Sequence, residues 1–150
     1  MNRNSLAKRL NIARWVTFVV SLLMAANALA MGLGSRFVYR NLYFACVPSM
    51  VAGLGLDNDF GFPTLPFTVM ALAMAGTYAL YWVLSKRRPF FLVPAFVSVT
   101  IDSAITLLFI ILYRATGAPL PWACILPAAV LHVAALACLW IGVRAWRRMQ

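Results

Sequence analysis

The chain has 150 residues, of which 64% are hydrophobic and 11% are charged. This composition excludes an ordinary soluble domain and is typical of an integral membrane protein. The net charge of +10 does not indicate a nucleic-acid partner, because the basic residues form short clusters beside apolar runs rather than one groove-sized patch.

Four apolar runs are each long enough to cross about 30 Å of hydrocarbon as a helix. They cover residues 15–34, 65–84, 90–113 and 120–143. We therefore predict an all-α integral membrane protein, with residues 1–150 forming a single domain of four transmembrane helices. Little of the chain remains for a soluble domain.

The first 14 residues alternate basic side chains with Leu6, Leu10 and Ile12, which predicts a short amphipathic helix on the inner membrane face. In the first span, Ala26-Asn27-Ala28 resembles a signal-peptide cleavage site. Because the apolar run continues to Gly34, beyond the length of a usual signal core, we interpret it as an uncleaved helix.

The connection between the first two spans, residues 35–64, is long and largely apolar. Its segment 42–56 is short for a crossing and is interrupted by Pro48, Gly53 and Gly55. A crossing there would also reverse the side on which the following basic cluster lies, against the positive-inside rule. We expect a re-entrant or interfacial segment that packs against the helices and caps their outer mouth.

This connection ends with two of the three acidic residues, Asp57 and Asp59. Carboxylates beside an Asn and a Gly suit a hard cation, but the spacing does not match a calcium-binding loop. An Asx-type turn leading to Pro63 explains the segment better, so we predict no metal site here.

The basic residues predict the orientation, because Lys and Arg flanking short loops stay in the cytoplasm. On one predicted side lie Arg3, Lys8, Arg9, Arg14, Lys86, Arg87, Arg88, Arg144, Arg147 and Arg148, and on the other only Arg36, Arg40 and Arg114. We expect both termini in the cytoplasm, in a bacterial inner (plasma) membrane, with anionic lipid headgroups around the basic side.

Asp102 lies near the middle of the third span, where a charged Asp costs roughly 2.5–3.5 kcal/mol on insertion scales. Ser98 and Thr106 recur four residues before and after it, so we expect the three on one inward face. Thr100 and Ser103 widen this polar stripe. Asn would supply a hydrogen bond without the ionisation penalty, so the acid itself indicates a functional site.

His132, the only histidine, lies at a similar depth in the fourth span. Asn27, Thr77 and Tyr78 from the first two spans are also near mid-membrane. Given suitable helix rotations, these side chains would form one polar centre, in which Asp102 and His132 would titrate as a coupled unit. The alternative is that they serve only as interhelical hydrogen bonds.

Small residues recur at four-residue intervals in the second span, as Ala71, Ala75 and Ala79. Weaker versions occur in the first span (Ala26, Ala30, Gly34) and in the fourth (Val130, Ala134, Cys138, Gly142). Such stripes permit close helix approach, either within one bundle or between protomers.

The three cysteines have no CxxC spacing. Cys46 and Cys124 share the predicted outer side and could form a disulfide there, or all three could be independent apolar packing residues. We see no phosphate-binding loop, serine elbow or metal-ligand cluster, and we expect no cofactor.

The leading hypothesis is a membrane protein that binds a small or lipidic ligand or a cation around Asp102 and His132, with Asn27, Thr77, Tyr78, Ser98 and Thr106 as further binding residues. Transport of that ligand would favour a homo-oligomer or a larger membrane partner, because a single bundle offers little room for a water path. One alternative is an accessory or structural subunit of a membrane complex. The other is an intramembrane lipid- or sterol-modifying enzyme with Asp102 and His132 as acid and base, but such an enzyme also needs a nucleophile or an electrophile activator, and no motif in the sequence indicates one.

Overall fold

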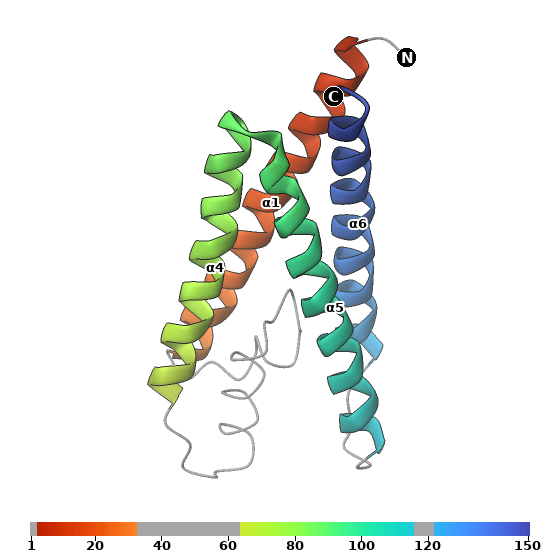
Figure 1. Ribbon diagram of the computed structural model, residues 1–150. Coiled ribbons are helices and arrows are strands. Elements are labelled where there is room, and N and C mark those ends of the chain that lie inside the picture. Colours follow the sequence, from red (N-terminus) through yellow and green to blue (C-terminus); the bar gives the residue numbers. More distant parts are fainter. Residues whose placement is uncertain (1–2, 33–63, 116–121) are drawn as a thin grey trace.

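The structure, a computed structural model, describes residues 3–32, 64–115 and 122–150. Over these ranges the chain is helical apart from short turns and contains no strand. The long helices are α1 (Arg3–Gly32), α4 (Thr64–Arg87), α5 (Leu92–Ala115) and α6 (Trp122–Arg147) (Figure 1). Each is long and apolar enough to cross a membrane, so the predicted all-α fold with four potential spans is confirmed.

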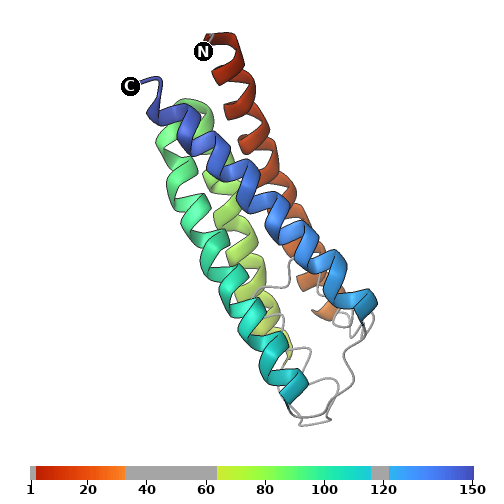
Figure 2. The ribbon, with the colours of Figure 1, turned by 90° about the vertical axis from the view of Figure 1, so that its right-hand side faces the viewer.

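The helices form a bundle in which α1 packs along both α4 and α6 (Figures 1 and 2). α5 packs on α6 and contacts α4 less extensively. Both termini lie at the same end of the bundle. The predicted cap at residues 42–56, the Asp57–Asp59 turn and the Cys46–Cys124 disulfide lie outside the described residues.

α1 is one continuous helix, which differs from the separate surface helix predicted for the first 14 residues. Leu6, Leu10 and Ala13 are buried, and the same face continues through Thr17 and Val20. Spacings of three and four residues keep these side chains on one stripe of a single helix. The first turns therefore extend the span instead of lying apart from it.

α1 and α4 approach closely because small side chains line their contact. Ala71 and Ala75 are buried, and the Ser21 hydroxyl donates a hydrogen bond of 2.8 Å to the Ala75 carbonyl. At the end of α1, a Cβ atom on Gly32 would lie 2.8 Å from Cγ2 of Thr68. The first two residues of the small-residue stripe on α4, Ala71 and Ala75, therefore pack within the bundle.

α1 and α6 meet in the same way at the end that carries the termini. A Cβ atom on Gly142 would collide with the Cβ atom of Ala13, so only glycine permits this approach without a shift of the helices. Two other members of the predicted stripes lie on the surface instead, since Ala26 on α1 and Ala134 on α6 are both exposed.

α4 and α5 are joined by a tight connection through the 3-10 turn η1 (Pro89–Phe91). The Arg88 amide donates to the Leu84 carbonyl over 2.9 Å, and the Phe91 amide donates to the Arg88 carbonyl over 3.1 Å. This connection makes α4 and α5 antiparallel neighbours and fixes where their facing residues meet.

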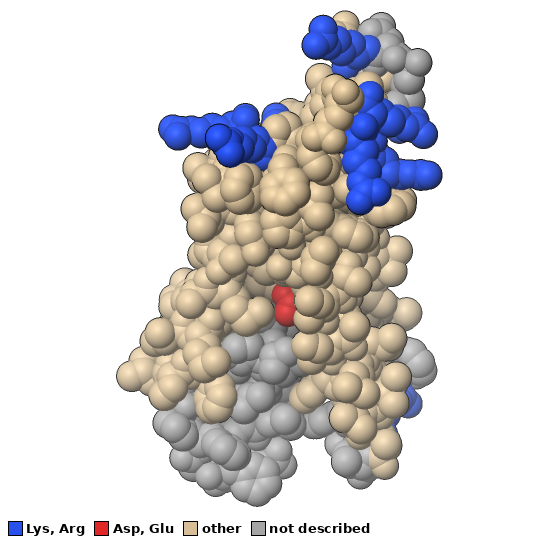
Figure 3. All heavy atoms as spheres, viewed as in Figure 1, with Lys and Arg blue, Asp and Glu red and all other residues tan. Residues whose placement is uncertain are grey.

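The outer surface of the bundle is apolar over its middle, as lipid contact requires. Large exposed hydrophobic residues occur on all four helices, among them Val19, Leu22, Val69, Leu80, Leu108, Ile111, Val130 and Val133. The described Lys and Arg residues instead gather at the end with the termini, except Arg114 near the far end of α5 (Figure 3).

Candidate functional site

Asp102 of α5 is buried, with 4% of its surface exposed, and its partner comes from α4. The Tyr78 hydroxyl donates a hydrogen bond of 2.8 Å to Oδ2 of Asp102. Tyr78 is itself buried and packs edge-on against Tyr81, with 6.1 Å between the ring centroids. The acid is therefore held by a rigid phenol from the neighbouring helix.

A groove of about 180 Å³ lies over this pair, between α4 and α5. Its lining comprises Met74, Thr77, Tyr78, Ser98, Ile101 and Asp102. In Figure 3 the acid is visible as the red atoms near the centre of the molecule, since Asp102 is the only acidic residue in the described ranges. Four of the seven predicted binding residues thus meet in what we call the α4/α5 groove.

His132 of α6 forms a hydrogen bond with Ser103 of α5. The distance between Nδ1 of the histidine and Oγ of the serine is 2.8 Å. The same hydroxyl donates to the Val99 carbonyl over 2.7 Å. A serine hydroxyl has one proton, so both contacts are satisfied together only when Nδ1 carries a proton and donates to Oγ. This arrangement leaves Nε2 as the acceptor nitrogen of the neutral ring.

The Ser103 and His132 pair borders a second groove, of about 230 Å³, between α5 and α6. Thr106 adds a hydroxyl, and the remaining lining is apolar: Leu107, Ile110, Ile125, Ala128, Ala129, Val133 and Leu136. We call it the α5/α6 groove. Its few polar groups sit beside a long hydrocarbon wall.

Asp102 and His132 consequently line different grooves and hydrogen-bond to different partners. The single polar centre that the sequence predicts for them needs a particular rotation of each helix, and the helices are not rotated in that way. Consecutive residues on a helix point about 100° apart, so Asp102 faces α4 while Ser103 faces the histidine on α6. The structure supplies two polar pairs on either side of α5.

The other predicted residues divide between these positions. Thr77 is exposed and its hydroxyl bonds to the Ala73 carbonyl of its own helix over 3.0 Å, at the edge of the α4/α5 groove. Thr106 lies in the α5/α6 groove, and its buried hydroxyl has no hydrogen-bond partner among the described residues. Asn27 on α1 is buried and lines neither groove.

Ser103 contacts His132 and borders the α5/α6 groove, although its sequence position predicts only a wider polar stripe. Its depth, equal to that of Asp102, was the available signal. Thr100, named with it, is exposed and bonds to the Phe96 carbonyl of its own helix. The sequence does not distinguish the hydroxyls of Thr100 and Ser103. They differ in the structure because α6 lies beside Ser103.

Within the described ranges, no three His, Cys, Asp or Glu side chains gather as a metal site would require. The two grooves instead offer hydroxyls, one carboxyl group and one imidazole. Comparisons of the chain with models of protein families, with curated proteins and with solved structures find no match. The chemistry of the grooves therefore carries the functional proposal.

Proposed function

We propose that this chain is an integral protein of a bacterial inner (plasma) membrane with both termini in the cytoplasm. The four apolar helices and the gathering of basic residues at the end with the termini support this placement. Lys and Arg residues beside short loops are retained on the cytoplasmic side.

We further propose that the α4/α5 groove binds a small amphiphilic ligand with a cationic or hydrogen-bond-donating group. The observation that supports this most is the Tyr78–Asp102 pair beneath a groove with further hydroxyls. The tyrosine bond engages Oδ2, so the carboxyl group keeps acceptor capacity on Oδ1 for a donor from the ligand. When it is ionised, a carboxylate in an apolar setting favours a cation over an anion or a neutral hydrocarbon, and a bound cation would in turn stabilise the ionised form.

The remaining lining indicates the rest of the ligand. Met74 and Ile101 supply apolar contacts, while Thr77 and Ser98 supply hydroxyls. Thr77 and Ile101 are both exposed on the outer surface of the bundle, which lipid would cover in the proposed membrane location. A ligand would therefore enter from the membrane, which suits an organic ammonium compound with an apolar body.

The α5/α6 groove is a second candidate, for a lipidic ligand. Its apolar wall fits an alkyl chain, and the unpartnered Thr106 hydroxyl lies beside Ser103 and His132, where a polar head could bond. An acid–base enzyme using Asp102 and His132 together is less well supported, because the two side chains border separate grooves.

The protein could also transport the bound cation. Transport would favour an assembly of more than one bundle. A single bundle of four helices leaves little room for a water path, so a homo-oligomer or a larger membrane partner would complete the route. Co-purification of a stoichiometric partner protein would favour the accessory-subunit alternative instead.

The binding proposal is tested with the full chain in lipid nanodiscs, using a series of primary and quaternary alkylammonium ions. We expect these ions to raise the thermal unfolding temperature of the wild type and to have no effect on Asp102→Asn. Thr100→Val is the matched control, since it removes from the same helix an exposed hydroxyl that lines neither groove.

Retention of the ammonium response in Asp102→Asn, or its absence in the wild type, would contradict cation binding at this groove. A response lost in Ser103→Ala but kept in Asp102→Asn would place the ligand in the α5/α6 groove. For transport, ammonium uptake by proteoliposomes should disappear in Asp102→Asn and persist in Thr100→Val.

A further inference from the structure

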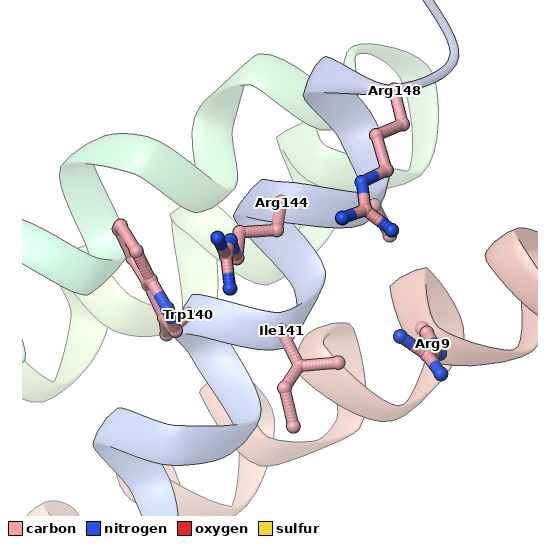
Figure 4. Close-up of a pocket in the computed structure, with 6 residues that line it drawn as sticks. Arg9, Trp140, Ile141, Arg144 and Arg148 are labelled. Atoms are coloured by element: carbon pink, nitrogen blue, oxygen red, sulfur yellow. The ribbon is translucent and has the colours of Figure 1, made fainter.

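A third pocket, of about 100 Å³, lies between α1 and α6 at the basic end of the bundle. It is lined by Arg9 of α1 and by Trp140, Ile141, Arg144, Ala145 and Arg148 of α6. Figure 4 shows Arg9 and Arg148 extending from the two helices toward the space beside Ile141, with Arg144 close to Trp140. The α6 residues recur at spacings of three and four, so they share one face of that helix.

The charge at this pocket is strongly positive. Three guanidinium groups border one small space, and the only acidic side chain among the described residues, Asp102, lies in the middle of α5. Like charges gathered in this way stabilise a bound anion. Arginine in particular presents pairs of N–H donors in a plane that matches the oxygens of a phosphate group.

The pocket also has an apolar side that faces the membrane. Trp140 and Ile141 are 42% and 43% exposed, and Cζ of Arg144 lies 5.5 Å from the centroid of the Trp140 ring. A tryptophan followed by arginines at the end of a span is typical of the membrane–water boundary. A ligand here would meet cations on one side and hydrocarbon-like side chains on the other.

We propose that this pocket binds a phosphate group and that an anionic phospholipid of the adjacent leaflet supplies it. A soluble phosphate compound carries the same anionic group, but it would leave Trp140 and Ile141 uncovered. Basic pockets between transmembrane helices are suited to anionic lipid headgroups. The proposal does not depend on what binds near Asp102.

The same end of the bundle provides an internal control. Lys86, Arg87 and Arg88 also carry three positive charges and are exposed, but they do not line this pocket. Lys86 lies over the ring of Trp82, with Nζ 3.5 Å from the centroid. General attraction between basic residues and anionic lipid would involve both clusters equally, whereas a defined site would involve only the first.

The test measures how much phosphatidylglycerol the purified full chain retains in native mass spectrometry, relative to phosphatidylcholine with the same acyl chains. One variant combines Arg9→Gln, Arg144→Gln and Arg148→Gln, and the control combines Lys86→Gln, Arg87→Gln and Arg88→Gln. We expect the first variant to lose phosphatidylglycerol preference by about a hundredfold and the control to keep most of it.

Equal losses in both variants, or no preference in the wild type, would overturn the proposal. A parallel arm adds glycerol phosphate to protein in phosphatidylcholine alone. In this arm the thermal unfolding temperature is measured. The lipid assignment would be wrong if glycerol phosphate raised that temperature as much as phosphatidylglycerol does and only the pocket variant lost the increase. The site would then bind a soluble phosphate compound. Should the triple variant fail to fold, Arg144→Gln and Arg87→Gln are compared as single substitutions, with the same expected contrast.

Discussion

The two sides of the bundle are built differently. Around α1, contacts with α4 and α6 depend on glycine, alanine and serine, and the helices approach until a single added Cβ atom would collide. Around α5, contacts with α4 are less extensive, and two grooves accompany polar pairs. The comparison suggests that α1 forms a rigid support while α5 carries the groups available to ligands.

The largest expected effect concerns the tight side. Gly142→Ala places a Cβ atom against that of Ala13, so the two helices must separate. Overpacking of this kind costs about 1–3 kcal/mol of unfolding free energy, which equilibrium unfolding in detergent micelles would measure.

Gly76→Ala is its matched control, because a Cβ atom there would meet nothing within 4 Å. Replacing a helical glycine without a clash should stabilise the protein by about 0.5–1 kcal/mol. Similar effects of the two substitutions would show that α1 and α6 do not meet as closely as described.

A smaller effect is expected between α4 and α5. Tyr78→Phe removes the donor to Asp102 and leaves a buried carboxyl oxygen without that bond. We expect a loss of about 1–2 kcal/mol of unfolding free energy. In a double-mutant cycle, Tyr78→Phe should have much less effect once Asp102→Leu is present, because leucine offers the phenol no acceptor.

Tyr81→Phe serves as the comparison, since Tyr81 lies one turn away on α4 and is only partly buried. Its loss should be smaller than that of Tyr78→Phe. Additive effects of Tyr78→Phe and Asp102→Leu would mean that the hydrogen bond does not couple α4 to α5.

The smallest effect is expected between α5 and α6. Ser103→Ala removes the hydroxyl that joins His132 to α5. Interhelical hydrogen bonds in membrane proteins average about 0.6 kcal/mol, and we expect a loss of that size in unfolding free energy.

Thr100→Val, which removes a hydroxyl bonded only to its own helix, should leave the unfolding free energy nearly unchanged. If Thr100→Val proved as costly as Ser103→Ala, the Ser103–His132 contact would contribute nothing specific to the packing of α5 on α6.

The sequence by itself determined the four potential membrane spans of the described residues and the separation of charge. Each predicted span lies within or close to a helix, because a run of about 20 apolar residues is a property of the local sequence. The ends were less well predicted. α1 begins at Arg3 instead of near Trp15, since the buried stripe through Leu6 and Leu10 continues the helix beyond the apolar run.

The composition of each groove was decided by the tertiary structure. Ser98 and Asp102 line the α4/α5 groove while Thr106 lines the α5/α6 groove, although the three recur at equal spacing. Each step of four residues turns a helix by about 40° beyond a full turn, so the stripe drifts from one neighbour to the next. Periodicity fixes such angles within a helix, but the rotation of one helix against another depends on packing between side chains far apart in sequence. That packing pairs Asp102 with Tyr78 and His132 with Ser103.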